Sequence, residues 1–119
     1  IEIPGPGIIF GDHTKEIKYI DFDFVPGADG TKILRPIKIN EKYFYNYLFT
    51  LEIEDRGYSR HFKFLNNNLF ALPPLGEQKR IVDKIEEVSA ILDLLIKTYK
   101  ESCHTKELLA KVMFNSILL

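Results

Sequence analysis

No glycine or proline occurs after Gly76, and apolar residues recur through that part of the chain at alternating spacings of four and three. This is the period of a helix that pairs with another helix along one seam. The sequence therefore predicts a long helix of the coiled-coil type. The seam lapses at Ser102 and Lys106. The interface positions that we expect are Ile81, Ile85, Val88, Leu92, Leu95, Tyr99, Leu109 and Met113.

The lapse in the seam leaves three possibilities open: a bend, a break into two helices, or a change of partner between residues 102 and 105. The start of the helix is better defined. Pro74 suits the first helical position, and Glu77 places a carboxylate near the positive end of the helix dipole.

The first 72 residues have a different character, because they are rich in glycine, proline and aromatic residues. Residues 8–10 form an apolar run between glycines, residues 16–25 alternate with Ile20, Phe22 and Phe24 on one face, and residues 31–39 form a third candidate strand. Pro36 places that third strand at an edge or a bulge. Asn40 then reads as a helix N-cap. We expect an α+β fold: a small mixed domain over residues 1–72, followed by a long helix or helical hairpin over residues 73–119.

Charge does not indicate a partner. Residues 1–72 carry nine Lys/Arg and ten Asp/Glu, and residues 73–119 carry seven of each. No apolar run approaches the roughly 20 residues that cross a bilayer, and no signal peptide is recognisable, so we expect no membrane contact. A single cysteine, Cys103, excludes an internal disulfide framework and favours a cytoplasmic protein. The absence of an initial methionine indicates a piece of a longer chain.

No catalytic constellation is recognisable. Glycines at positions 5, 7 and 11 match no phosphate-loop pattern. The acidic residues near His13 have no metal-ligand spacing, and Cys103 and His104 point about 100° apart on a helix. We expect no metal, no cofactor and no enzymatic activity of the chain by itself.

Two short basic stretches are the candidates for contact with nucleic acid. Residues 56–63, RGYSRHFK, contain no acidic residue, and residues 13–18, HTKEIK, follow a glycine-rich turn. Arginine can grip phosphates or read a guanine edge, whereas the bland alternative is a solvated basic turn. The candidate DNA contacts are Thr14, Lys15, Lys18, Arg56, Tyr58, Arg60, His61 and Lys63.

Residues 72–88, LPPLGEQKRIVDKIEEV, resemble the signature that ends a target recognition domain in specificity (S) subunits of type I restriction-modification systems. Residues 10–34 and the stretch RGYSRHFKFL also resemble the distal part of such a domain. The resemblance implies a partial DNA target recognition domain over residues 1–72 and a conserved helical region over residues 73–119.

The same resemblance implies a non-catalytic subunit that reads double-stranded DNA. Methyltransferase (M) subunits, which use S-adenosylmethionine, and nuclease/translocase (R) subunits would assemble with it. Independently of the resemblance, the apolar seam from Ile81 to Tyr99 predicts that the helix self-associates. The alternative is an assembly module whose helix oligomerises without contacting DNA. Two features separate these interpretations. A shared solvent face for residues 13–18 and 56–63 favours DNA binding, and arginines paired with Glu52, Glu54 or Asp55 favour the assembly module.

Overall fold

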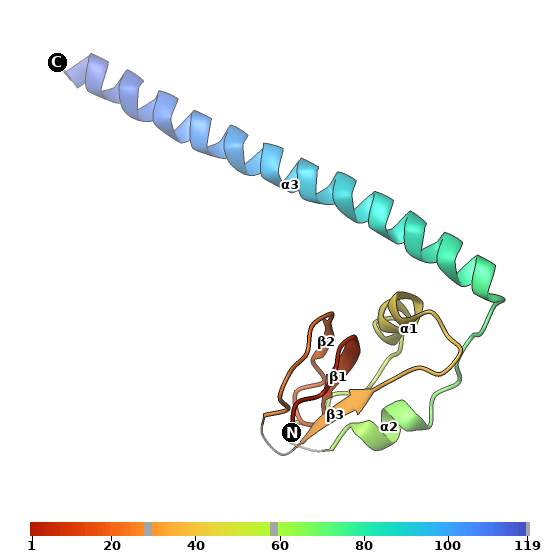
Figure 1. Cartoon of the computed structure of the whole chain (residues 1–119). Helices are drawn as coiled ribbons and strands as arrows, with labels where there is room; N and C mark the ends of the chain where they lie inside the picture. Colours follow the sequence, from red (N-terminus) through yellow and green to blue (C-terminus); the bar gives the residue numbers. More distant parts are fainter. Residues whose placement is uncertain (28–29, 58–59, 119) are drawn as a thin grey trace. The chain divides into compact units, whose positions relative to one another are not determined.

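Residues 1–27, 30–57 and 60–118 are described by the computed structural model of the chain. Two compact units are distinguished, Ile1–Val82 and Asp83–Leu119. The first unit contains three strands, β1 (Gly7–Gly11), β2 (Ile17–Ile20) and β3 (Thr31–Leu34), and two short helices, α1 (Glu41–Leu48) and α2 (Phe62–Asn66). The long helix α3 (Leu75–Leu118) begins in the first unit and forms the second (Figure 1). The expected α+β class with a long C-terminal helix is confirmed.

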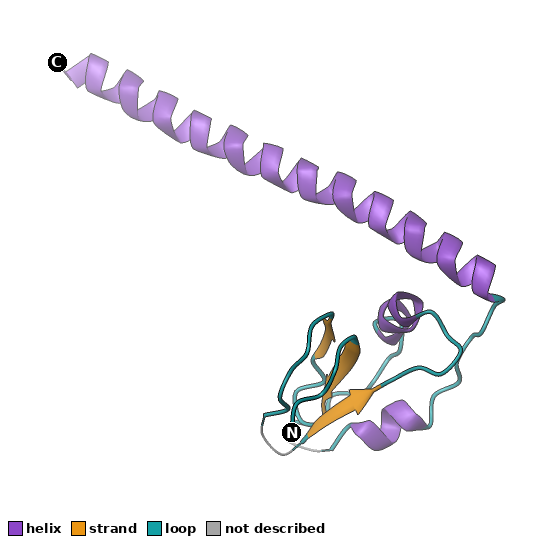
Figure 2. Cartoon of the chain, viewed as in Figure 1, coloured by secondary structure: helices purple, strands orange, loops and turns teal. Residues whose placement is uncertain are grey.

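The strands form one antiparallel sheet in the order β2-β1-β3, with β1 at its centre (Figure 2). In this register Ile8 of β1 lies opposite Tyr19 of β2 and Leu34 of β3. These three residues share the face that packs on the core. Strand β3 lies at an edge and ends before Pro36, because proline has no amide hydrogen to continue the ladder.

The second expected strand is shorter than its alternation predicts. Strand β2 ends at Ile20, and Phe24 pairs with Ile3 in an isolated bridge outside the three strands. Phe24 is 8% exposed, whereas Phe22 is 64% exposed. The prediction that Phe22 shares a buried face with Phe24 is therefore wrong, because the chain leaves the pleat between Ile20 and Phe24.

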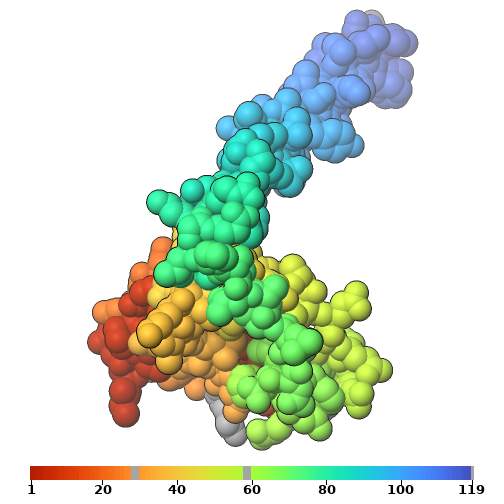
Figure 3. All heavy atoms as spheres, turned by 90° about the vertical axis from the view of Figure 1, so that its right-hand side faces the viewer, coloured from red at the N-terminus to blue at the C-terminus, as the bar shows by residue number. Residues whose placement is uncertain are grey.

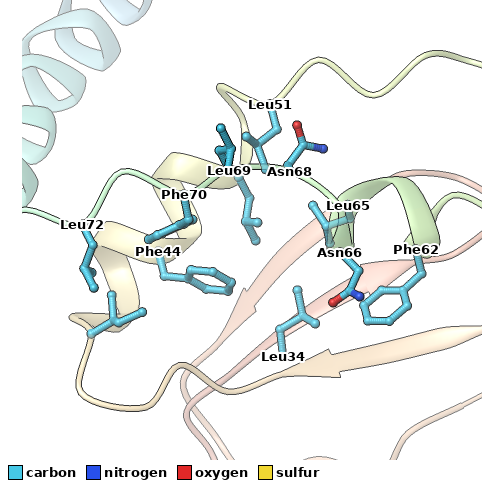
Figure 4. A pocket seen from close by; sticks show the side chains of 12 residues that line it. Leu34, Phe44, Leu51, Phe62, Leu65, Asn66, Asn68, Leu69, Phe70 and Leu72 are labelled. Atoms are coloured by element: carbon cyan, nitrogen blue, oxygen red, sulfur yellow. The ribbon is translucent and has the colours of Figure 1, made fainter.

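The core lies between the sheet, α1 and α2. Its fully enclosed side chains are Ile8 and Phe10 of β1, with Leu48 of α1 and Leu65 of α2 packed against them. Burial of each such side chain contributes about 1.5–3 kcal/mol. An apolar pocket of about 410 Å³ extends from this core. Figure 4 shows how Phe44, Leu65 and Leu34 line it.

Helix α1 begins as its sequence predicts. The side chain of Asn40 accepts a hydrogen bond from the Tyr43 amide at 3.0 Å, which satisfies one of the unpaired donors of the first turn. Tyr43 and Leu48 are buried. The ring of Tyr45 packs against that of Tyr19 at a centroid distance of 5.7 Å, so α1 rests on the sheet.

The segment between α2 and α3 is held against α1 by two tyrosine hydroxyls. Tyr43 donates to the Ala71 carbonyl at 2.8 Å, and the Tyr47 hydroxyl accepts from the Ala71 amide at 3.1 Å. The Phe70 ring lies 4.3 Å from the Tyr47 ring and 5.2 Å from the Phe44 ring, centroid to centroid. In Figure 3 this green segment runs along the surface of the first unit.

Gln78 fixes the first turn of α3 to the start of α1. Its side chain is 1% exposed. Its Oε1 accepts from the Asn40 amide at 2.8 Å, and its Nε2 donates to the Pro73 carbonyl at 2.8 Å. Pro74 lies one residue before α3, and its carbonyl accepts the first helical hydrogen bonds, from Glu77 and Gln78. Pro74 itself was predicted to be the first helical residue, whereas the first residue of α3 is Leu75.

Helix α3 continues without interruption through Ser102 and Lys106 to Leu118. The lapse in the apolar seam is thus neither a break into a hairpin nor the end of the helix. Val82 is buried in the first unit, whereas the seam beyond it is open to solvent. The exposed fractions rise from 36% at Ile85 to 52% at Leu92 and 72% at Tyr99.

Substitution of Gln78 by Ala is expected to lower the free energy of unfolding of the first unit by about 1–3 kcal/mol, because the Asn40 amide and the Pro73 carbonyl would have no partner. Urea unfolding followed by tyrosine fluorescence measures this change. Lys79→Ala is the matched control, since Lys79 is the exposed neighbour. Equal midpoints for the two variants would contradict the assigned role of Gln78.

Candidate nucleic-acid interface

The turn after β1 and the start of α2 meet at Asp12, although they are far apart in the sequence. The Asp12 carbonyl accepts from the His61 amide at 2.9 Å, and its Oδ1 accepts from the Phe62 amide at 2.8 Å. The Asp12 amide donates to the Gly30 carbonyl at 2.8 Å. Asp12 is 2% exposed, so it joins three segments from inside the fold.

His61 is part of the same connection. Its ring is fully buried, and Nδ1 lies 2.9 Å from the Asp12 carbonyl oxygen. Because a carbonyl can only accept, Nδ1 carries the hydrogen, and Nε2 accepts from the Arg56 amide at 3.4 Å. His61 thereby holds the loop that carries Arg56, and its ring does not face solvent.

The Asp12 carboxylate is surrounded by positive charge. The hydrogen bond from the Phe62 amide is the main cause that lowers the pKa of this carboxyl below its ordinary value, while burial opposes the shift. Lys32, Arg60 and His13 lower the pKa further. Arg60 Nη1 lies 3.9 Å from Asp12 Oδ2, and its own side chain is 65% exposed. The ionised carboxylate is therefore stabilised by nearby basic groups, of which Arg60 forms an ion pair with it.

Two further cations converge on the ring of Phe64. The guanidinium carbon of Arg56 lies 4.6 Å from the ring centroid, and Nζ of Lys63 lies 4.9 Å from it. Arg56 Nη2 also donates to Glu54 Oε2 at 2.8 Å. The chain turns at Gly57, whose φ of +67° suits glycine, and the Gly57 amide donates to Asp55 Oδ1 at 3.0 Å.

The second basic stretch is divided between two places. Nζ of Lys15 lies 3.3 Å from Asp55 Oδ2, which places Lys15 beside the loop that carries Arg56. Thr14 and Lys18 instead line a small hollow of about 190 Å³ next to Ile9 and Thr31. Lys18 also lies 3.6 Å from Glu16. Tyr58, another expected contact, lies outside the described residues.

Lys32 is a further basic residue whose charge acts on Asp12, although it was not among the candidate DNA contacts predicted from the sequence. It lies on β3, and its Nζ is 5.8 Å from the centroid of the Phe62 ring. The register places Lys32 opposite Phe10, beside the start of α2. Only the pairing of β1 with β3 brings Lys32 to this position, and no local sequence pattern around residue 32 predicts that pairing.

Within residues 1–27, 30–57 and 60–118, no group of three or more His, Cys, Asp and Glu side chains is placed to hold a metal ion. None of the helices described has a segment that is both long enough and apolar enough to span a bilayer.

Basic side chains from the turn after β1, from β3, from the loop at Arg56 and from α2 lie near Asp12, Phe62 and Phe64. A local group of lysines and arginines is typical of the nucleic-acid-binding class of protein. The family model described as "Type I restriction modification DNA specificity domain" matches residues 1–102. The chain therefore belongs to this family and has a DNA specificity role in type I restriction-modification systems. No curated protein and no solved structure matches the chain.

The stability of the first unit is expected to fall in acid through Asp12. Its pKa is lower in the folded state than its ordinary value of 3.8, so its contribution is complete above that value and disappears as pH falls through the folded-state pKa. Asp12→Asn should therefore be less stable than the wild type at about pH 7, and the difference should narrow towards about pH 3.

Unfolding by urea at a series of pH values measures this difference. Asn retains an acceptor for the Phe62 amide, whereas Asp12→Ala removes it. Asp12→Ala should therefore lower the free energy of unfolding by about 1–3 kcal/mol at every pH above that at which Asp12 is protonated in the folded state. A pH-independent difference between the wild type and Asp12→Asn would contradict the role of the carboxylate charge.

Proposed function

We propose that this chain is the non-catalytic, DNA-reading part of a type I restriction-modification specificity subunit, and that the surface above Asp12 contacts the duplex. The observation that carries the proposal is the meeting of residues 12–15 with residues 54–57 and 60–63 in a member of this family. The proposed contacts, which make up this surface, are Lys15, Lys32, Arg56, Arg60 and Lys63. Thr14 and Lys18, in their neighbouring hollow, are secondary candidates, and so is Tyr58.

His61 is left out of the proposed contact set, since its buried ring is occupied on both nitrogens by main-chain groups. Its role in DNA binding would be indirect: it holds the Asp12 turn and the Arg56 loop together.

The ion pairs of this surface bear on the choice between DNA recognition and assembly. Arg56 pairs with Glu54, which favours the assembly interpretation. Both partners are more than half exposed, however, and exposed pairs contribute about 0–1 kcal/mol. A phosphate or a base edge can therefore compete for the guanidinium. The proximity of Lys15 to Asp55 supports DNA binding, because it brings one lysine of the second basic stretch beside the loop that carries Arg56.

The proposed division of labour follows the two parts of the chain. Residues 1–72 would read one part of a DNA target, and residues 73–119 would act as the helical spacer. Methylation would be carried out by M subunits that use S-adenosylmethionine, and cleavage by R subunits in the full complex. The alternative, an assembly module without DNA contact, is favoured by the long row of exposed apolar side chains on α3.

Substitution of Arg60 or Lys63 by Ala is expected to weaken binding to all duplexes alike if the side chain contacts a phosphate. Removal of one phosphate contact should lower the slope of log affinity against log salt by about one unit, because fewer counterions are released. Titration of the specificity chain, assembled with its methyltransferase subunits, across a salt series measures this slope.

Lys97→Ala is the matched control, since Lys97 is an exposed lysine on α3. If Arg60→Ala, Lys63→Ala and Lys97→Ala all retain the wild-type affinity and slope, the surface above Asp12 is a solvated turn and the assembly interpretation replaces the DNA proposal.

The α3 seam is expected to mediate self-association. Leu92 and Leu95 are 52% and 60% exposed, and such a continuous apolar stripe on a helix is normally covered by a partner. A second copy of the helix presents the same seam. Leu92→Asp should convert dimers to monomers, since a buried unpaired carboxylate costs several kcal/mol. Lys97→Asp, which adds an acid away from the seam, should leave the dimer intact.

Sedimentation equilibrium at micromolar concentration distinguishes these states. A wild-type chain that sediments as a monomer, or a Leu92→Asp variant that remains a dimer, would exclude the seam as a self-association surface.

A further inference from the structure

Within the proposed surface, Arg56 is held at both ends. Its main-chain amide donates to the buried ring of His61 at 3.4 Å. Its guanidinium lies over the Phe64 ring at 4.6 Å and donates to Glu54 at 2.8 Å. Arg60, by comparison, reaches Asp12 through a longer ion pair of 3.9 Å.

A restrained guanidinium has an advantage in reading a base. A bidentate contact to a guanine edge requires two N–H groups at a fixed angle, and a free arginine side chain loses conformational entropy when binding orders it. Arginine has five donors, and the contact with Glu54 uses Nη2. Other donors of Arg56 therefore remain for a base edge while Glu54 and Phe64 fix the plane of the group.

Glu54 should also weaken the binding of unrelated DNA sequences, in which Arg56 finds no guanine at the matching position. Its carboxylate is 75% exposed beside the guanidinium, where it repels a phosphate that approaches the same group. Binding to unrelated sequences consists mainly of phosphate contacts. Glu54 should thus favour the target in two ways: it orients Arg56 for the base, and it disfavours phosphate binding at that position.

We propose that Arg56 is the base-reading arginine of this surface and that Glu54 and Phe64 are positioning residues, which act through Arg56 to separate the target sequence from unrelated DNA. The proposal rests on the proposed DNA-recognition function. It assigns the other cations, Arg60, Lys63, Lys15 and Lys32, to contacts that carry no sequence information.

The neighbouring residue Asp55 provides a matched control. Asp55→Asn removes one negative charge at the same loop, as Glu54→Gln does, and it retains an acceptor for the Gly57 amide. The partner of Asp55 is Lys15, an ammonium with no plane to orient. Removal of this charge should therefore strengthen binding to target and unrelated duplexes by the same factor.

The test uses the specificity chain assembled with its methyltransferase subunits. The target is taken from the sites that the wild-type complex methylates, and affinities are measured for this duplex and for an unrelated one. Arg56→Lys should weaken target binding by about ten- to a hundredfold and leave unrelated binding unchanged. Glu54→Gln should weaken target binding severalfold while binding to unrelated DNA stays equal or rises. Arg56→Lys should also relax the methylated sequence at one position.

The outcomes are separable. A wild-type complex that binds both duplexes equally would overturn the proposed function itself. A wild-type complex that discriminates, together with an Arg56→Lys variant that discriminates equally well, would overturn only the assignment of Arg56. Identical ratios of target to unrelated affinity for Glu54→Gln and Asp55→Asn would overturn the positioning role of Glu54. Far-ultraviolet circular dichroism confirms that each variant is folded.

Discussion

The buried hydrogen bonds of Asp12 are the interaction on which the candidate surface depends. One residue at the end of β1 binds the His61 amide and ring through its carbonyl and the Phe62 amide through its carboxylate. These bonds bring the turn after β1 and the start of α2, about fifty positions apart, to one place. Loss of any one of these bonds would leave a buried polar group unpaired, which costs about 1–3 kcal/mol. The bonds therefore stabilise the positions of both segments. Arg56, Arg60 and Lys15 owe their proximity to that framework rather than to one another.

A second set of contacts serves the junction with α3. Tyr43 and Tyr47 satisfy the main-chain groups of Ala71, and Gln78 satisfies the Pro73 carbonyl and the Asn40 amide. The ring of Phe70 packs against that of Tyr47. Proline supplies no amide hydrogen, so this segment cannot be secured by a regular ladder. Side chains of α1 and α3 perform that task instead. Pro73 and Gln78, which belong to the two parts of this junction, therefore have a physical reason to occur together.

Local patterns predicted the parts of the fold that local chemistry decides. The Asn40 cap, the first strand, the turn at Gly57 and the long helix α3 each follow from a few adjacent residues. Phe22 was misplaced because alternation does not reveal where a strand leaves its sheet. The seam lapse at Ser102 did not end the helix, since the segment contains no glycine or proline and is flanked by good helix formers such as Glu101 and Lys106.

The candidate site was predictable only in composition. Arg56, Arg60 and Lys63 were evident as a basic stretch, but the burial of His61 requires knowledge of Asp12, its partner in the fold. The place of Lys32 depends on a strand register, and the orientation of Arg56 depends on Glu54 and Phe64 together. These contacts depend on the tertiary structure, so local sequence patterns do not predict them.

Photo-crosslinking tests the central claim most directly, that the surface above Asp12 faces the duplex. A photoreactive residue is placed at position 63, beside the Phe64 ring, and separately at position 42 on α1, in the assembled complex with methylated-site DNA. The account predicts a protein–DNA adduct from position 63, at bases within the target, and none from position 42. Adducts from position 42 alone, or equal yields from both positions, would contradict it.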